Sequence, residues 1–309
     1  MGPNFIFRSV KLSPLKKIPI LTGQTASGKT DIACKLVEEF DDLVVIFADS
    51  RKIYRYMDIG TAKPHSPCRE RYRMLDLVEP NEQYNVWRYY RRAEEEIGKA
   101  LSEGRRVLVE GGTVFYIRAL VEGLSDYPPV PDELVRDLES RDTSDLYNLL
   151  RERDPRRASQ IHPSDRFRIL RSLYVVLVAG KPYEEASRER FVPPSFQYEP
   201  FVLSIPTGEL HRSIEKRVYD MLEEGLLEEV KYLVERYGPD AVALRKTIDY
   251  FEFIPYLEGK ITLEEAIRDT IRDTKDFARR QKTFLKKIGG RRGGRREAFQ
   301  WLSEFLKRT

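Results

Sequence analysis

Eight residues near the start of the chain have the types and spacing that hold phosphate groups. They read Gly23-Gln24-Thr25-Ala26-Ser27-Gly28-Lys29-Thr30 and fit the pattern G-x-x-x-x-G-K-[ST]. The glycines let backbone amides converge on a phosphate, and the start of a following helix adds a favourable dipole. We expect Lys29 to reach the phosphate oxygens and the Thr30 hydroxyl to hold a magnesium ion. The loop therefore predicts a diphosphate or polyphosphate ligand, with ATP as the default, but not a reaction.

The segments around this loop supply the strand and the helix that it requires. An apolar run at 18–21 precedes it, and residues 30–40 carry apolar side chains at helical spacing. Further apolar runs of strand length occupy 43–48 and 107–109. Strands that alternate with helices predict a parallel sheet flanked by helices, an α/β core of the P-loop NTPase-like class.

Two polar residues follow the second and third of these strands. Ligands of parallel sheets lie at the carboxyl ends of the strands, so we expect Asp49 and Thr113 to lie beside the phosphate loop. A carboxylate at the place of Asp49 can act as a general base, although a helix cap or a magnesium ligand would use the same residue. Thr113 follows two glycines and could contact a ligand, but it is equally suited to cap the helix expected at 114–122.

The remainder of the chain divides at a proline-rich break near residue 127. Residues 127–199 look helical, and we expect them to form an insertion between the two parts of the core, 1–126 and 200–309. A last helix is expected at about 263–287. The Gly-Arg repeat at 289–296 is of low complexity and is expected to be flexible.

Two basic segments could contact nucleic acid. On the expected helix around 165–171, Arg168 and Arg171 share a face and Phe167 lies next to them, which suits a phosphate backbone and an unstacked base. The alternative is a solvated face of an amphipathic helix whose apolar side is core. The segment 277–284 is also basic and precedes the Gly-Arg repeat.

Composition sets broad limits. Hydrophobic residues make up 41% of the chain, the net charge is +4, and no apolar run approaches the length of a membrane span. The first 17 residues are basic without a continuous apolar run, which argues against a secretory signal but leaves an organellar address open. Cys34 and Cys68 form no metal pattern and no disulfide framework, which suits a reducing cytoplasm.

Taken together, these segments resemble the tRNA dimethylallyltransferase family from about residue 18 to residue 287. The matching pieces are GQTASGKT at 23–30, ADSRKIYRYMDIGTAKP at 48–64, EGGTVFYIRAL at 110–120, HPSDRFRILRSL at 162–173, RVYDMLEEGLLEEV at 217–230 and FARRQKTF at 277–284. The piece from Asp49 to Pro64 is the most specific, because a kinase with the same loop is not expected to carry it.

The resemblance implies transfer of a dimethylallyl group from its diphosphate to the exocyclic amine of the adenine just 3′ of the tRNA anticodon. It implies that the loop holds the departing diphosphate with Lys29 and Mg²⁺ on Thr30, that Asp49 is the base, and that Thr113 lies near the reacting centre. The implied tRNA contacts are Asp49, Ser50, Arg51, Lys52, Thr113, Phe167, Arg168, Ile169, Leu170 and Arg171. The insertion would clasp the anticodon stem-loop, and the target base would leave its stack.

Several positions depart from the family pattern without removing the loop lysine, Asp49 or Thr113. They are Gln24 for Pro, Lys52 for Gln, Val114 for Gly, Arg166-Phe167 and Leu170 for Gln-containing positions, Ser213 for Arg, Asp249 for Gly and Phe284 for Trp. They bear on RNA contacts and rate more than on the chemical class.

Three other functions remain as alternatives. A transferase that prenylates free adenine nucleotides would need neither the insertion nor the basic C-terminal helix. A small-molecule kinase would use the loop for ATP, but no lid is recognisable. A noncatalytic RNA-binding protein would not need the loop lysine and Asp49. No segment implies a protein partner or a membrane, so a cytoplasmic monomer is the simplest expectation.

Overall fold

The structure is a computed structural model that describes residues 15–309, in two compact units. The first unit consists of residues up to Val121 together with Ser195–Thr309, and the second is Glu122–Pro194. The insertion was predicted at 127–199, a few residues later at each end. The prediction about a leader falls almost wholly on residues 1–14, outside the described part.

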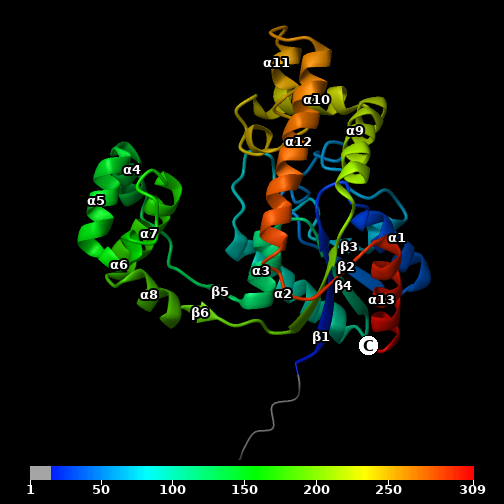
Figure 1. Cartoon of the computed structure of the whole chain (residues 1–309), viewed down its shortest axis with the longest axis horizontal. Helices are drawn as coiled ribbons and strands as arrows, with labels where there is room; N and C mark the ends of the chain where they lie inside the picture. Colours follow the sequence, from blue (N-terminus) through cyan, green and yellow to red (C-terminus); the bar gives the residue numbers. More distant parts are fainter. Residues whose placement is uncertain (1–14) are drawn as a thin grey trace, which may run out of the picture. The chain divides into compact units, whose positions relative to one another are not determined.

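A six-stranded sheet forms the centre of the first unit (Figure 1). Its order is β3-β2-β4-β1-β7-β8, and each neighbouring pair is parallel. The strands are β1 (Lys17–Gly23), β2 (Leu43–Phe47), β3 (Tyr72–Arg73), β4 (Arg106–Gly111), β7 (Gln197–Leu203) and β8 (Arg291–Gly293). β1, β2 and β4 are almost continuously buried, as strands covered on both faces must be. The predicted α/β class is therefore confirmed.

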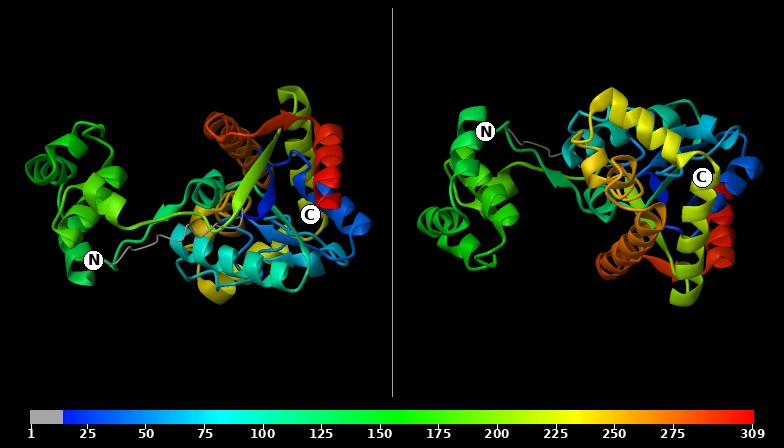
Figure 2. Two further views of the ribbon diagram at one scale, coloured as in Figure 1. Left: turned by 90° about the horizontal axis from the view of Figure 1, so that it is seen from below. Right: turned by 90° about the horizontal axis from the view of Figure 1, so that it is seen from above.

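Helices cover both faces of this sheet (Figures 1 and 2). α1 (Lys29–Glu39) and α13 (Arg295–Lys307) pack against each other on one face, whereas α2 (Val86–Ser102) packs against the other. α3 (Val114–Glu122) follows β4, and α12 (Leu263–Leu285) contacts both β1 and α9. Asn85 caps α2 by accepting the N–H of Arg88, and Thr262 begins α12 with a capping box.

The predicted flexibility of 289–296 is wrong. Residues 291–293 form β8, which pairs with β7, and α13 begins at Arg295. The Arg292 guanidinium donates to the carbonyl oxygens of Leu285 and Ile288, so it joins the end of α12 to the strand. A Gly-Arg repeat has no apolar alternation, which is why the sequence did not indicate a strand here.

Three helices with a short connecting turn form a second layer of the first unit. They are α9 (Thr207–Glu223), α10 (Leu226–Tyr237) and α11 (Ile254–Leu257), with the 3₁₀ turn η2 (Leu244–Lys246) between α10 and α11. Their apolar faces share one core with Ile53, Tyr54 and Met57. This core anchors the segment that follows Asp49.

The second unit is helical apart from a short antiparallel pair of strands. Its elements are β5 (Leu124–Ser125), α4 (Asp132–Ser140), α5 (Thr143–Arg153), α6 (Pro155–Ala158), α7 (Arg166–Ala179), α8 (Tyr183–Glu189) and β6 (Phe191–Val192). Its core includes Leu138, Leu146, Leu150, Ile169 and Leu173. No helix in the described part of the chain is long and apolar enough to cross a membrane.

The two cysteines form a disulfide, which corrects the prediction that they make no such framework. The bond joins Cys34 on α1 to Cys68, the first residue of the 3₁₀ turn η1 (Cys68–Arg71). The partners are 34 positions apart and meet only because η1 folds back against α1. The cysteine count therefore no longer argues for a reducing compartment.

Reduction of this disulfide is expected to lower the melting temperature by roughly 5–10 °C. A closed loop of this length restricts the unfolded chain by about 3–4 kcal/mol in the loop-entropy model. Differential scanning calorimetry with and without reductant measures the effect. The double variant Cys34→Ser/Cys68→Ser is the control, since it should melt early in both buffers. Equal wild-type melting temperatures in the two buffers would contradict the expectation.

Candidate active site

The phosphate-binding loop connects β1 to α1. Gly28 precedes the helix with φ at 89°, a left-handed conformation that favours glycine, and Ala26 is also left-handed at 55°. The Ser27 hydroxyl and the Lys29 ammonium both donate to the carbonyl oxygen of Gln24, at 2.8 and 2.7 Å. The Lys29 side chain therefore folds back onto the backbone of its own loop.

Charged groups of both signs are buried at the foot of this loop. Burial lowers the pKa of Lys29, while the negative charges of Glu110 and Asp49 act in the opposite direction. Burial raises the pKa of the Glu110 carboxyl, and the cations Lys52 and Lys29 oppose that shift. These groups lie close enough for their charges to influence one another, although they come from β4, α1 and the end of β2.

Asp49 and Thr113 meet at the carboxyl ends of β2 and β4, as their spacing predicted. The Thr113 hydroxyl accepts the N–H of Ser50 at 2.9 Å, and the Thr113 N–H donates to Ala48 O at 3.1 Å. A carboxylate oxygen of Asp49 accepts the N–H of Arg51 at 2.8 Å. The Thr113 hydroxyl is thus engaged with the segment that carries Asp49.

Gly111 explains why the two strand ends can approach so closely. A Cβ atom at this position would lie 2.1 Å from Ala48 O, a distance that no side chain could tolerate. The first glycine of the Gly-Gly-Thr sequence is therefore required by the backbone contact between β2 and β4.

Two side chains at the loop were given no role by the sequence. Gln281 of α12 accepts the N–H of Thr25 at 2.8 Å and donates to Gly112 O at 2.8 Å. Arg217 of α9 donates to the Thr25 hydroxyl at 3.4 Å. Both residues fall within segments that the resemblance covers, RVYDMLEEGLLEEV and FARRQKTF, but spacing alone could not bring them to the loop.

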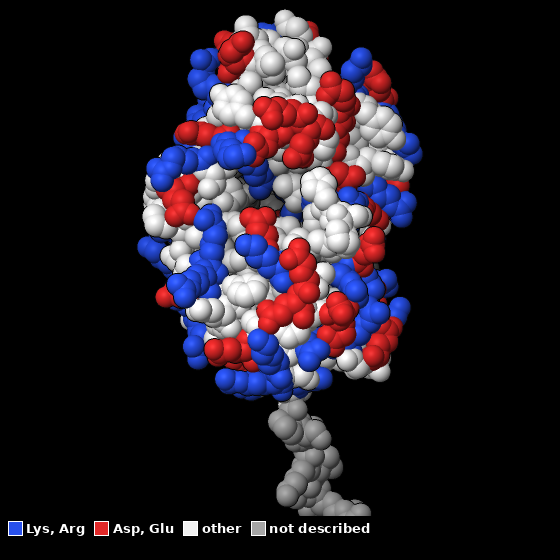
Figure 3. Space-filling view, turned by 90° about the vertical axis from the view of Figure 1, so that its right-hand side faces the viewer, with Lys and Arg blue, Asp and Glu red and all other residues white. Residues whose placement is uncertain are grey.

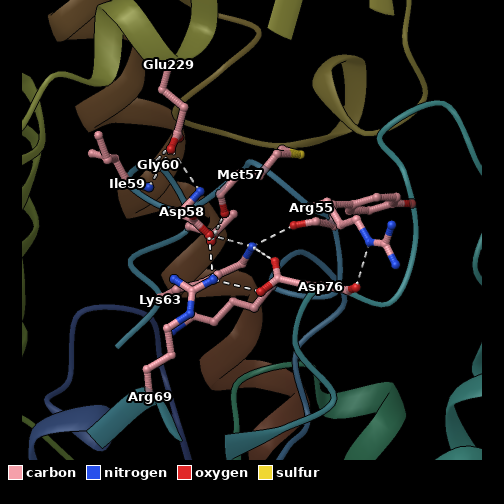
Figure 4. Close-up of polar contacts among 12 residues, drawn as sticks. Arg55, Met57, Asp58, Ile59, Gly60, Lys63, Arg69, Asp76 and Glu229 are labelled. Atoms are coloured by element: carbon pink, nitrogen blue, oxygen red, sulfur yellow. Dashed lines mark hydrogen bonds and ion pairs between the residues drawn. The ribbon is translucent and has the colours of Figure 1, made fainter. Parts of the chain in front are cut away.

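The segment that follows Asp49 is fixed by ion pairs around one buried lysine (Figure 4). The Lys63 ammonium has no exposed surface and lies 2.8 Å from Asp58 and 2.6 Å from Asp76, both of which also contact Arg69. From α10, the carboxylate of Glu229 accepts the N–H groups of residues 58–60. These contacts fix the conformation of the segment that follows Asp49, although the segment is neither a regular helix nor a strand.

Lys52 points inward. Its ammonium donates to Ala62 O at 2.7 Å and lies over the Phe47 ring, 4.3 Å from the centroid. Burial lowers the pKa of Lys52 to about 8. The ammonium therefore sits with the buried charges of the site, whereas the predicted contacts of Ser50 and Arg51 with tRNA stay predictions.

The predicted RNA-contacting residues of the second unit lie at the start of α7. Phe167 is 81% exposed, and Arg168 pairs with Asp165 at 2.7 Å. Arg171 stacks over the Tyr127 ring at 5.1 Å. Ile169 has no exposed surface, so its predicted contact with RNA is corrected to a place in the core. Leu170 is partly buried against the same core.

Comparison with known proteins decides the family. The family model described as IPP transferase matches residues 52–288, which is most of the chain. The chain belongs to this family. It is 39% identical over 275 residues to tRNA dimethylallyltransferase 1 of Citrifermentans bemidjiense, covering 88% of this chain and 89% of that protein. It is also 39% identical over 277 residues to tRNA dimethylallyltransferase of Thermotoga petrophila, covering 88% and 90%.

Solved structures of the IPP transferase family share the fold. The tRNA isopentenylpyrophosphate transferase of Bacillus halodurans superposes with a TM-score of 0.68 at 27% identity, over 94% of this chain and 96% of that one. A eukaryotic dimethylallyltransferase acting on tRNA superposes with a TM-score of 0.78 at 29% identity, over 88% and 70%. The sequence-based assignment to this family is confirmed.

Two departures from the family pattern have structural partners of their own. The Gln24 side chain donates to Ala278 O on α12 at 2.8 Å. Asp249 adopts φ of 77°, a conformation that favours glycine, and burial raises its pKa to about 6 against the opposing charge of Arg217. Burial, helped by Asp249, also raises the pKa of Glu252 to about 8.

Replacement of Glu252 by glutamine is expected to stabilise the protein above pH 8 but not at pH 5. The folded state binds a proton at Glu252 more tightly than the unfolded chain does. Wild-type stability should therefore fall as pH rises from about 4.5 to about 8, by on the order of 3–5 kcal/mol from this group. Urea unfolding across this pH range tests the difference between variant and wild type. Glu235→Gln on the exposed surface is the control, and a difference for Glu252→Gln that does not change with pH would contradict the expectation.

Proposed function

We propose that this protein transfers the dimethylallyl group of dimethylallyl diphosphate to the exocyclic amine of the adenine just 3′ of the tRNA anticodon, releasing diphosphate. The observation that carries the proposal is the meeting of the loop, Asp49 and Thr113 at the carboxyl ends of β1, β2 and β4. Membership of the IPP transferase family, with relatives named tRNA dimethylallyltransferase, supports the same reaction.

The chemistry requires one bond to form and one to break. The adenine amine attacks the allylic carbon, and the bond from that carbon to the diphosphate oxygen breaks. Asp49 accepts the proton that the amine loses. Lys29 and the nearby Arg217 stabilise the negative charge of the departing diphosphate. The adenine must leave its stack to reach this position.

The proposal includes a magnesium ion at the loop. Thr30 offers a hydroxyl oxygen, the type of ligand that Mg²⁺ takes beside substrate phosphates and water. Among residues 15–309, no group of three or more His, Cys, Asp or Glu side chains is placed to hold a metal by itself. When bound, the ion supplies positive charge to the diphosphate. Thr30 is the residue that would hold it.

The proposal also assigns tRNA contacts. Ser50 and Arg51 would contact the target nucleotide, while Phe167, Arg168 and Arg171 of the second unit would contact the anticodon stem-loop. Basic and acidic side chains are interspersed over the face shown in Figure 3, which fits the small net charge of +4. We place the protein in the cytoplasm as a monomer.

One experiment separates this function from its alternatives. The protein is incubated with dimethylallyl diphosphate, AMP, ATP, Mg²⁺ and an unmodified tRNA that carries adenine beside the anticodon, and nucleosides and nucleotides are analysed by mass spectrometry. We expect a prenylated adenosine from this tRNA and none from a tRNA with guanine at that position. Prenylated AMP or ATP with unmodified tRNA would favour the free-nucleotide transferase. Phosphoryl transfer from ATP would favour the kinase.

A further inference from the structure

Glu110 lies between the phosphate loop and the edge of the sheet. It is the penultimate residue of β4, directly before Gly111, and has no exposed surface. One carboxylate oxygen is 3.3 Å from the Thr30 hydroxyl, and the other is 3.2 Å from the Tyr72 hydroxyl. A carboxylate only accepts, so both hydroxyl groups donate their hydrogens to it.

The surroundings hold this carboxylate in one place. The Tyr72 ring packs on the Phe47 ring with centroids 4.8 Å apart. The Lys52 ammonium lies over the same Phe47 ring, 4.3 Å from its centroid. Lys29 and Lys52 supply the positive charge that accompanies the buried carboxylate. The hydroxyl of Thr30 therefore meets an acceptor whose position is determined by β2, β3 and β4 together.

We infer that Glu110 is a positioning residue for the cation of the phosphate loop: it accepts the hydrogen bond of the Thr30 hydroxyl and thereby turns the oxygen lone pairs of Thr30 toward the ion. A threonine hydroxyl has a single hydrogen, so donation to Glu110 leaves its lone pairs free for a metal. Groups that orient a ligand in this way typically change metal affinity by about 10–100-fold. The inference rests on the proposed role of the loop as the diphosphate site.

The test is the effect of Mg²⁺ on the affinity for inorganic diphosphate, measured by isothermal titration calorimetry with Mg²⁺ or with EDTA. We expect Glu110→Met, which fills similar space but offers Thr30 no acceptor, to reduce the gain in affinity from Mg²⁺ by about 10–100-fold. In EDTA the variant should bind diphosphate as tightly as wild type or more tightly, since a negative charge near the anion is removed. A residue with only a structural role would weaken binding in both buffers.

Two more variants keep the test decisive. Glu110→Asp keeps the charge but withdraws the acceptor from Thr30, so it should lose most of the gain from Mg²⁺ even if the methionine variant folds poorly. Thr30→Val should lose the gain as well, and adding Glu110→Met to it should change the gain less than about twofold. An unchanged gain in Glu110→Met or Glu110→Asp, or additive losses in the double variant, would overturn the inference.

The test of Glu110 and the test of the proposed function can fail independently of each other. A wild type that binds diphosphate equally well with and without Mg²⁺ would overturn the inference about Glu110. A wild type whose diphosphate binding depends on Mg²⁺ and on Glu110, but which adds no prenyl group to tRNA, would overturn the proposed function alone.

Discussion

Replacement of Asp49 by alanine is expected to leave tRNA affinity unchanged and to lower turnover by about a hundred- to ten-thousandfold. The carboxylate follows β2 directly, and its hydrogen bond with the N–H of Arg51 fixes its orientation beside the loop. Loss of a base at this position removes the acceptor for the proton of the attacking amine. Single-turnover assays with prebound tRNA measure the chemical step, and filter binding measures the affinity.

Two further variants sharpen this experiment. Asp49→Asn keeps an oxygen that can accept from Arg51 N–H but cannot take up a proton, so we expect it to be nearly as slow as the alanine variant. Asp41→Ala, on the exposed turn before β2, is the matched control and should keep wild-type turnover. If Asp49→Ala turns over within about threefold of wild type, Asp49 is not the base.

The part of the site that the sequence predicted lies at strand ends. In a parallel sheet, residues that directly follow neighbouring strands must lie at the same edge. This rule predicts Thr113 beside the Asp49 segment, as the structure shows. The Gly-Gly pair before Thr113 was interpreted as room for a ligand, whereas Gly111 is required by the backbone contact with Ala48 O. The phosphate loop was recognisable because its whole pattern lies within eight consecutive residues.

The parts that the sequence did not predict depend on contacts between distant segments. Gln281 is 256 positions from Thr25, and Arg217 is 192 positions away, so no local pattern reports either contact. The Cys34–Cys68 bond and the strand β8 were missed for the same reason, because each needs a partner from elsewhere in the fold. Lys52 was predicted to contact tRNA, and its inward position was missed because a charged side chain is seldom buried without partners.

Replacement of Lys29 by methionine is expected to lower the rate of prenyl transfer by about a hundred- to a thousandfold. The ammonium is buried beside the loop, where a fixed charge stabilises a developing anion more strongly than it would in water. Methionine fills similar space and avoids the cost of burying a cation, a cost that the lowered pKa of Lys29 reflects. We therefore expect no fall in melting temperature to accompany the loss of rate.

The kcat and KM of the Lys29→Met variant distinguish stabilisation of the leaving group from simple binding of the donor substrate. Negative charge grows on the diphosphate as its bond to the allylic carbon breaks, so a group that stabilises the departing ion acts mainly on kcat. A group that only holds the donor substrate would instead raise KM at unchanged kcat. Lys35→Met, on the exposed side of α1, is the matched control. A Lys29→Met variant with wild-type kcat and a raised KM would show that the loop lysine binds the donor without assisting departure, and the reaction would then depend on Arg217 and the cation for that step.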